Sequence, residues 1–261
     1  KKEIRIATYS MKDIKEDNDI ELEVFIHVAI YASYSGRCVL SNFLTNRDSN
    51  RGGCSQICRW DFDLYNDDKL LKGAKPFTFC TKDLSLSKYI PDLVSLNVDS
   101  LKIEGRMRSV YYIATIVKTY RKLIDEYCKN PKTYKYNLEY EKILNECANR
   151  DSIPQFFDGN FGKEVQYYNG RVETTNQDFI GLILSYDEKT GLAKLQQRNL
   201  FKKGQTIEIF GPDTNIKFKI NEIYDEDMNK IDVVRHPKQI VYLKTPKKVK
   251  ENYMVKCIDK H

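Results

Sequence analysis

The sequence has no long apolar run. No stretch of its 261 residues approaches the roughly 20 apolar residues that a membrane-spanning helix needs. The opening stretch KKEIRIA contains no secretory signal and reads directly into a strand-like run. Seven cysteines are too few for a disulfide scaffold in a chain of this length. We therefore expect a cytoplasmic protein with reduced thiols and no association with a membrane.

Histidine is scarce as well, with three residues in the chain. The G-x-S-x-G motif of serine hydrolases and the H-E-x-x-H motif of zinc proteases are both absent from the sequence. A Cys–His dyad would have to use His27 or His236, because the third histidine is the last residue. The sequence therefore gives a protease little support.

The first half alternates strand-like and helix-like segments. The apolar patterns predict strands at 4–9, 21–30, 77–83 and 100–106, and helices at 10–18, 91–97 and 109–127. The helix at 109–127 has apolar residues at three-and-four spacing that predict one buried face: Val110, Ile113, Val117, Tyr120, Ile124 and Tyr127. Alternation of this kind predicts an α/β fold with a parallel sheet, whose functional groups lie at the carboxyl ends of the strands.

The second half changes character. A charged helix is predicted at 138–149, and from residue 178 onward the pattern is purely β. The stretch IKFKINEI alternates apolar and polar residues, as a strand with one wet face should. Short strands at regular spacing predict a small antiparallel β-barrel. We therefore expect a first domain over 1–130, a connecting helix and linker over 131–177, and an all-β domain over 178–261.

Four cysteines fall in one irregular stretch of the first half: Cys38, Cys54, Cys58 and Cys80. Thiolates are soft ligands that select zinc or an iron–sulfur cluster. The C-x3-C spacing of Cys54 and Cys58 is less specific than paired C-x2-C motifs, so spacing alone leaves buried thiols without a metal equally open. The remaining cysteines are scattered, and we interpret them as small apolar residues.

A second polar group stands at the end of the strand predicted over 100–106. Lys102 and Arg106 could bind the carboxylates of a small diacid, and Glu104 could act as a general base or hold Arg106 in place. An internal salt-bridge network is the alternative. His27, at the end of the strand over 21–30, could transfer protons or bind substrate, or it could be a satisfied core residue.

Basic residues gather in the second half. Residues 238–261 carry seven lysines against two acidic residues, and Lys202 and Lys203 follow Phe201. Basic groups beside aromatic rings suit contacts with RNA phosphates and bases. A lysine-rich tail is also typical of an ordinary solvated surface, and small β-barrels serve as protein docking modules too.

Two long stretches resemble the collagenase-like peptidase U family. They are EVFIHVAIYASYSGRCVLSNFLTNRDSNRGGCSQICRW and TKDLSLSKYIPDLVSLNVDSLKIEGRMRSVYYIATIVKTYRKLIDEY. A third stretch, IGLILSYDEKTGLAKLQQRNLFKKGQTIEIFGP, resembles the additional β-barrel domain of that family. The resemblance implies a TIM-like (α/β)8 catalytic barrel, of which this chain would supply the second half. A half barrel exposes two sheet edges, so a second chain or a second copy could complete it.

The resemblance also implies an iron–sulfur cluster, of the 4Fe-4S type, held by four cysteines. Cys38, Cys54 and Cys58 stand at matching positions. Two other cysteine positions of the family are Tyr31 and Ser85 in this chain. The fourth ligand is therefore Cys80 or a residue outside this sequence.

The function implied by the resemblance is tRNA modification. Family members with the added β-barrel hydroxylate the wobble uridine of tRNA to 5-hydroxyuridine, with prephenate as co-substrate, so tRNA and prephenate are the expected partners. The historical family name keeps a collagenase-like peptidase as an alternative. A truncated, non-catalytic module that binds tRNA or protein is a third possibility.

Overall fold

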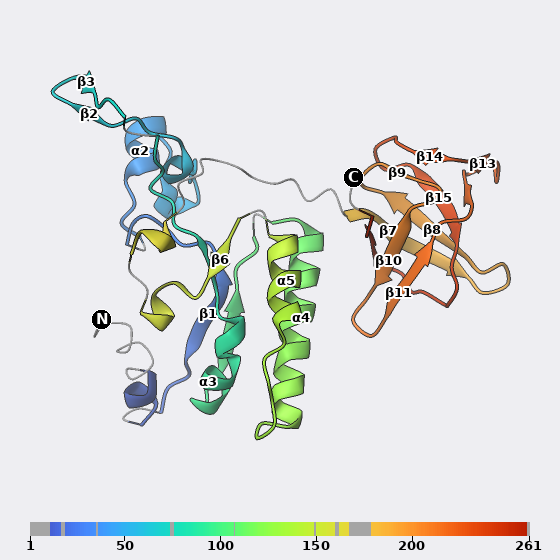
Figure 1. Cartoon of the computed structure of the whole chain (residues 1–261), viewed down its shortest axis with the longest axis horizontal. Coiled ribbons are helices and arrows are strands. Elements are labelled where there is room, and N and C mark those ends of the chain that lie inside the picture. Colours follow the sequence, from blue (N-terminus) through green and yellow to red (C-terminus); the bar gives the residue numbers. More distant parts are fainter. Residues whose placement is uncertain are drawn as a thin grey trace. The chain divides into compact units, whose positions relative to one another are not determined.

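The structure is a computed structural model. It describes residues 11–16, 19–34, 36–73, 76–106, 108–148, 150–159, 162–166 and 179–259. The chain divides into two compact units, Lys1–Thr174 and Thr175–His261 (Figure 1). The strand predicted over 4–9 lies outside the described residues. Residues 11–16 are helical, within the helix predicted over 10–18.

A four-stranded sheet forms the centre of the first unit. Its strand order is β5 (Ser100–Ile103), β1 (Glu23–Val28), β4 (Asp83–Ser85) and β6 (Ser152–Ile153). β1 pairs in parallel with β5, and β4 pairs in parallel with β6, but β1 and β4 are antiparallel. The sheet is therefore mixed, and the predicted half of a TIM-like barrel is not confirmed.

The antiparallel pair follows from the path of the chain between β1 and β4. In its described residues, 29–34, 36–73 and 76–82, that connection is irregular and contains no single crossover helix of the kind that joins parallel strands. It brings the start of β4 back to the end of β1, where Leu84 lies opposite Val28 and Ser85 opposite His27. β4 therefore runs back along β1.

The strand predicted over 77–83 is wrong in its position, because the sheet strand is β4. Within the predicted range, Phe77 and Thr81 form only isolated bridges, to Phe62 and Gln166. The ring centroids of Phe62, Phe77 and Phe79 lie 5.1–6.0 Å apart. This aromatic cluster accounts for the apolar alternation without a long strand.

The predicted helices are present as α3 (Ile90–Ser95), α4 (Val110–Lys129) and α5 (Leu138–Cys147). The Ser109 side chain caps α4 by accepting a hydrogen bond from the backbone N–H of Tyr112. α5 packs against α4 (Figure 1). The two packed helices position Arg108, which precedes α4, and Arg150, which follows α5.

The apolar face predicted for α4 is turned from the face that the structure buries. Val110 is 70% exposed and Val117 is 47% exposed. The buried residues are Tyr111, Tyr112, Ile116, Thr119, Tyr120 and Leu123. Thr119 tolerates burial because its hydroxyl donates to the Thr115 carbonyl oxygen at 2.8 Å. The three-and-four spacing correctly predicted a helix with one buried face. That face consists mainly of tyrosines and of Thr119, whose hydroxyl is hydrogen-bonded within the helix, and not of the predicted aliphatic residues.

The cysteine-bearing segment consists of short elements. They are α2 (Leu40–Thr45), η1 (Ser49–Arg51), η2 (Ile57–Arg59), β2 (Tyr65–Asn66) and β3 (Lys69–Leu70). The β2–β3 hairpin projects away from the rest of the first unit (Figure 1). The remaining short helices of the unit are η3 (Ser87–Tyr89), η4 (Gln155–Asp158) and η5 (Lys163–Val165).

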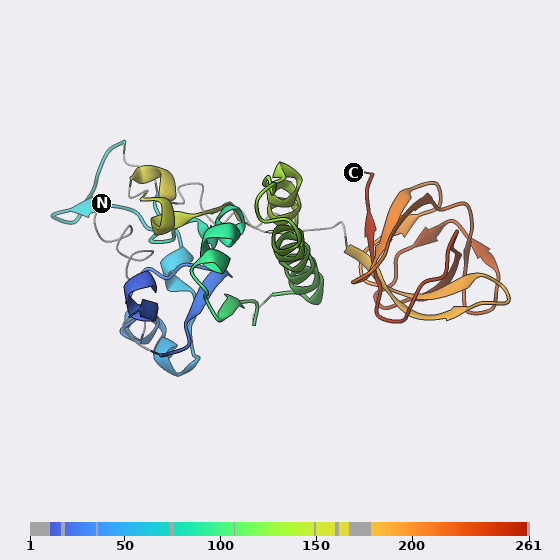
Figure 2. The same ribbon diagram turned by 90° about the horizontal axis from the view of Figure 1, so that it is seen from below.

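An antiparallel sheet of eight strands forms the second unit and curls into a half-barrel (Figure 2). Its strands, in spatial order, are β11 (Asn215–Lys219), β10 (Thr206–Phe210), β16 (Met254–Cys257), β7 (Phe179–Asp187), β8 (Leu192–Gln197), β15 (Ile240–Lys244), β12 (Ile223–Tyr224) and β13 (Lys230–Ile231). β9 (Phe201–Lys202) and β14 (Val233–Val234) pair separately. The prediction of an all-β domain is confirmed. The predicted closed barrel is not confirmed, because the outer strands β11 and β13 of the described sheet do not pair with each other.

The concave face of this sheet buries an aliphatic core that includes Ile183, Leu195 and Ile209. Phe201 belongs to the same core and is fully buried. Its ring is therefore inaccessible to a nucleic-acid base, and the predicted RNA contact at Phe201 is wrong.

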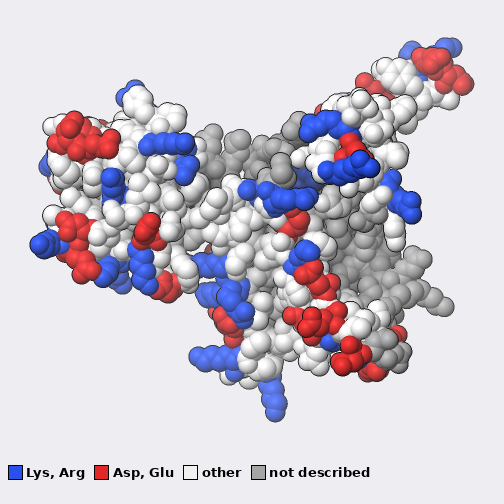
Figure 3. Space-filling model, turned by 180° about the vertical axis from the view of Figure 1, so that it is seen from behind, with Lys and Arg blue, Asp and Glu red and all other residues white. Residues whose placement is uncertain are grey.

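Three of the six described lysines near the end of the chain form ion pairs. Lys248 pairs with Glu188, Lys250 with Asp213 at 2.8 Å, and Lys256 with Glu208 at 3.2 Å. Figure 3 shows basic and acidic side chains interspersed over the second unit. The lysine-rich tail is therefore not a continuous positive surface. Among the helices that the structure describes, none is long and apolar enough to cross a bilayer.

Candidate functional site

His27 lies at the end of β1 and is 1% exposed. Its Nδ1 atom is 3.3 Å from the Tyr120 hydroxyl oxygen, and that hydroxyl donates to the Ile26 carbonyl oxygen at 2.9 Å. Ser85 Oγ lies 3.2 Å from the same hydroxyl. Burial, followed by the charge of Arg108, lowers the pKa of His27 to about 4. The ring is therefore neutral at pH 7.

A carboxylate with two arginine partners forms the centre of the site. Asp83, at the start of β4, is 4% exposed. Its Oδ2 atom accepts hydrogen bonds from Nη2 of Arg108 at 2.8 Å and from Nη2 of Arg150 at 2.9 Å. Because Arg108 precedes α4 and Arg150 follows α5, Asp83 ties both helix ends to the sheet.

Burial raises the pKa of Asp83 to about 6, against the opposing charges of Arg108 and Arg59. The carboxylate is therefore ionised at neutral pH. Three buried polar atoms near this cluster have no hydrogen-bond partner among the described residues: Asp83 Oδ1, Arg150 Nε and His27 Nε2. Unpaired buried polar atoms are costly, so their concentration here indicates a site where a further polar group could bind.

The structure separates the predicted trio Lys102, Glu104 and Arg106. Lys102 is exposed, with Nζ 2.6 Å from Glu23 Oε1 and 5.1 Å from the centre of the Phe25 ring. Glu104 accepts a hydrogen bond from the backbone N–H of Arg106 at 3.0 Å, so it holds the loop rather than the guanidinium. The charge of Glu104 acts on Asp83. Glu104 therefore belongs with the buried cluster, and Lys102 does not.

Cys58 lies within electrostatic reach of each of the other three cysteines of this group. Burial raises the pKa of Cys58, Arg59 opposes this, and Cys54 and Cys38 add to the rise. Burial raises the pKa of Cys80 to about 11, with Cys58 contributing and Arg59 again opposing. Cys58 is thus the member whose surroundings include the other three, and Arg59 supplies a positive charge beside Cys58 and Cys80.

These cysteines fit an iron–sulfur cluster in donor type. In the part of the chain that the structure describes, however, no three His, Cys, Asp or Glu side chains gather in metal-binding geometry. Cys80 Sγ instead donates to the Thr81 carbonyl oxygen at 3.3 Å and lies 3.9 Å from Arg150 Nη1. The ligand set therefore stays a prediction.

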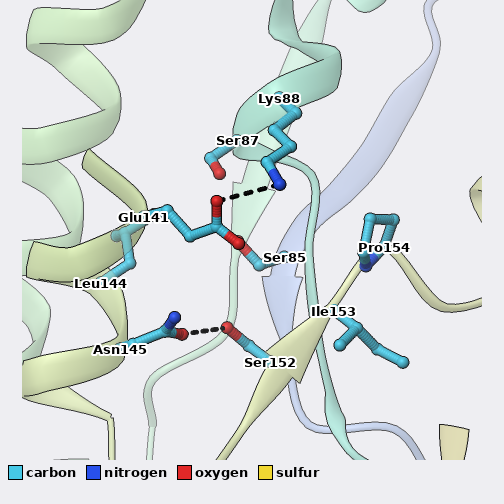
Figure 4. Close-up of a pocket in the computed structure, with 9 residues that line it drawn as sticks. All are labelled: Ser85, Ser87, Lys88, Glu141, Leu144, Asn145, Ser152, Ile153 and Pro154. Carbon is cyan, nitrogen blue, oxygen red and sulfur yellow. Dashed lines mark hydrogen bonds and ion pairs between the residues drawn. The ribbon is translucent and has the colours of Figure 1, made fainter. Parts of the chain in front are cut away.

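A pocket lies between α5 and the strands β4 and β6 (Figure 4). It has about 270 Å³ of empty space, part of which is open to solvent. Its polar lining is paired internally: Lys88 Nζ lies 2.9 Å from Glu141 Oε2, and Ser152 Oγ donates to Asn145 Oδ1 at 3.1 Å. Since these groups satisfy one another, we assign no ligand to this pocket.

Sequence reasoning missed Asp83 and Arg150 as partners. Asp83 had a weak signal, because it is an acidic residue at the end of the apolar stretch predicted as a strand over 77–83. Arg150 had none, since it stands 67 residues from Asp83 and the pairing of β6 with β4, in which Ser152 lies opposite Asp83, brings it near. Arg108 follows the predicted trio but received no role of its own.

Both units match known family models. Residues 3–167 match the model of peptidase family U32, and residues 175–256 match that of the family U32 C-terminal domain. The chain belongs to peptidase family U32. The resemblance seen in the sequence is therefore confirmed.

Curated relatives of this U32 chain carry two kinds of name. It is 49% identical over 257 residues to tRNA hydroxylation protein P1 of Bacillus subtilis, covering 96% of this chain and 61% of that protein. It is 29% identical over 285 residues to tRNA hydroxylation protein P of Haemophilus influenzae, covering 90% and 61% respectively. It is 26% identical over 226 residues to a collagenase of Porphyromonas gingivalis, covering 83% and 63%.

The U32 chain thus spans 61% of the length of the Bacillus and Haemophilus proteins. Among solved structures, it is similar to the crystal structure of a U32 C-terminal domain from Geobacillus thermoleovorans. The identity is 41% and the TM-score is 0.31, covering 33% of this chain and 98% of the other.

The buried His27 predicts a pH dependence of stability. Its pKa falls from 6.5 to about 4 on folding, so between these values the unfolded chain binds more protons and stability falls as the pH falls. Between pH 7 and pH 4.5 we expect His27 to contribute roughly 2.4 kcal/mol to this loss. Urea unfolding at pH 7 and pH 4.5 measures it, and a His27→Gln variant should lose less stability over the interval. Equal losses in both proteins would contradict the burial of a neutral ring.

Proposed function

We propose that this chain is part of a tRNA hydroxylation enzyme that converts the wobble uridine to 5-hydroxyuridine with prephenate as co-substrate. The observation that carries this is the 49% identity, over 96% of the chain, to tRNA hydroxylation protein P1 of Bacillus subtilis. Prephenate and the position of the modified uridine come from the family resemblance in the sequence.

The buried cluster around Asp83 supports binding of a small dianion such as prephenate. A guanidinium has five N–H donors, and Asp83 accepts from a single nitrogen of each of its two arginines. Further donors on Arg108 and Arg150 could therefore bind a carboxylate. Both lie in a desolvated setting where charge pairing is stronger than on the surface. Arg106, the predicted binder, is exposed, which weakens its interaction with an anion.

The other site residues fit the same proposal. Glu104 lies in the charge network of Asp83 and could accept a proton from the substrate. His27 is neutral, and its Nε2 atom has no hydrogen-bond partner among the described residues. It would therefore form a hydrogen bond to the substrate rather than a charge pair with it. Cys38, Cys54, Cys58 and Cys80 would hold an iron–sulfur cluster, which supplies redox chemistry when bound.

A cellular test of this function measures 5-hydroxyuridine in total tRNA by nucleoside mass spectrometry. Deleting the gene should abolish the nucleoside, and the intact gene should restore it. An Arg108→Gln gene should restore at least about tenfold less, because a hydrogen bond to a charged group contributes about 1.5–3 kcal/mol. Arg121→Gln is the matched control, since it removes the same charge from an exposed pair with Asp125 on α4. An unchanged 5-hydroxyuridine level in the deletion strain would contradict the proposal.

A peptidase is the second candidate, because the chain is 26% identical to a collagenase of Porphyromonas gingivalis. The geometry gives it no support within the described residues: His27 contacts Tyr120 and Tyr112, and His236 belongs to the other unit. Cleavage of denatured collagen by the purified chain, abolished in Cys54→Ser, would favour this candidate over hydroxylation. A non-catalytic module would show tRNA binding but neither activity.

A further inference from the structure

A row of tyrosine and lysine side chains crosses four neighbouring strands of the second unit. Its members, in strand order, are Lys230 on β13, Tyr224 on β12, Tyr242 on β15 and Lys194 on β8. Each residue lies directly opposite the next in the register. We call this set the tyrosine–lysine row.

The tyrosine–lysine row faces away from the core. Ile223, Leu243 and Ala193 each stand one position along the strand from a member of the row, and all three are buried in the core. Successive side chains of a strand point to opposite faces, so the row lies on the outer face of the curled sheet. Lys230 is exposed, and the other three members are half-buried.

The charges along the row differ at its two ends. Lys194 Nζ lies 6.0 Å from the centre of the Tyr242 ring, and no acidic side chain among the described residues pairs with it. At the other end, Glu222 pairs with Lys230 and accepts a hydrogen bond from the Tyr224 hydroxyl. The Tyr242 end therefore combines an aromatic ring with an uncompensated cation.

We propose that the tyrosine–lysine row binds unpaired RNA, with bases stacked on Tyr242 and Tyr224 and a phosphate beside Lys194. Every base has a π face, so aromatic side chains on an open sheet bind single strands without reading a sequence, and a neighbouring lysine neutralises the backbone. The formal net charge of the chain, +6, also favours a polyanion. This inference rests on the proposed function, in which tRNA is the substrate, and adds the surface that holds it.

The contrast with the three paired lysines near the end of the chain supports this choice of surface. Lys248, Lys250 and Lys256 of the tail each pair with an acidic residue, which reduces their attraction to phosphate. Phe201 is buried and cannot stack on a base. Tyr242 and Lys194 combine what those positions lack, an accessible ring and an unpaired charge.

Binding of the full chain to labelled RNA, followed by fluorescence anisotropy, tests the proposal. One probe is an anticodon stem–loop with uridine at the wobble position, and the other is a fully paired hairpin of equal length. Tyr242→Leu should weaken stem–loop binding about tenfold, because stacking on one ring is lost. Tyr242→Phe should bind like the unaltered chain, since it keeps the ring.

The lysine is tested by its salt dependence. Lys194→Gln should reduce the slope of log K against log salt by about 0.7, the value for one contact with a single strand. Lys217→Gln removes the same charge from β11, the strand at the opposite edge of the sheet. It should leave the affinity for the stem–loop and the salt slope nearly unchanged. Thermal melting of every variant checks that the second unit is folded.

Two results would overturn the proposal. If folded Tyr242→Leu, Tyr224→Leu and Lys194→Gln bind the stem–loop like the unaltered chain, the row is a surface for protein or solvent. If the unaltered chain binds neither RNA, the row is not an RNA-binding surface. The cellular 5-hydroxyuridine assay reports on the proposed function independently, so its failure is distinguishable from a failure of the row.

Discussion

Replacing Asp83 by alanine is expected to lower the free energy of unfolding of the first unit by about 3–5 kcal/mol. Asp83 is the shared partner of Arg108 and Arg150, at 2.8 Å and 2.9 Å. Arg150 is 9% exposed, so without the carboxylate its charge stays buried and uncompensated. Removing one member of a buried ion pair costs more than the pair contributes, because the remaining charge keeps its desolvation penalty.

Urea unfolding measures this loss, with Asp125→Ala as the matched control. That variant removes an aspartate from an exposed pair with Arg121 on α4, and such pairs contribute only about 0.3–0.5 kcal/mol. Leu195→Ala in the core of the second unit identifies the transition of that unit, which Asp83→Ala should leave in place. A loss for Asp83→Ala as small as that for Asp125→Ala would contradict the central role of this carboxylate.

Local patterns in the sequence predicted the elements better than their arrangement. Helical periodicity is a local property, and α3, α4 and α5 lie within a few residues of their predicted bounds. The buried face of α4 depends instead on which neighbours meet Tyr112 and Tyr120. Tyr120 turns inward because its hydroxyl reaches Ile26, His27 and Ser85, and the apolar spacing carries no information on that contact.

The direction of β4 could not be predicted for a similar reason. Alternating strands and helices favour a parallel sheet, but between β1 and β4 the chain passes through the irregular cysteine-bearing segment. No local pattern in the sequence predicts whether the chain that leaves this segment enters the sheet beside the start or beside the end of β1. The ladder between His27 and Ser85 fixes that direction and makes the pair antiparallel.

Residue type alone indicated the polar site only in part. His27 and Glu104 were selected because each ends a strand, and both lie beside the buried Asp83 cluster. Lys102 was selected by the same rule, yet it forms an exposed pair with Glu23. Strand alternation would place Lys102 and Glu104 on one face, but β5 ends at Ile103 and Glu104 lies in the loop that follows, so the two side chains separate.

The largest chemical effect is expected for Cys58. After purification without oxygen, we expect about four iron atoms and four acid-labile sulfides per chain, the content of one 4Fe-4S cluster. Cys58→Ser should lose most of both, because the surroundings of Cys58 include Cys38, Cys54 and Cys80. Cys128→Ser is the matched control, since that thiol is exposed on α4 and is not one of the predicted ligands.

The same measurement on Cys80→Ser decides the fourth ligand. Burial raises the pKa of the Cys80 thiol to about 11, so coordination must displace a proton and uptake by this thiol should improve as the pH rises. Loss of iron equal to that in Cys58→Ser would make Cys80 a ligand. Retention of iron would place the fourth ligand outside this sequence. An unaltered chain without iron and sulfide, or a Cys58→Ser chain that keeps both, would exclude the cluster from these cysteines and leave them as structural thiols.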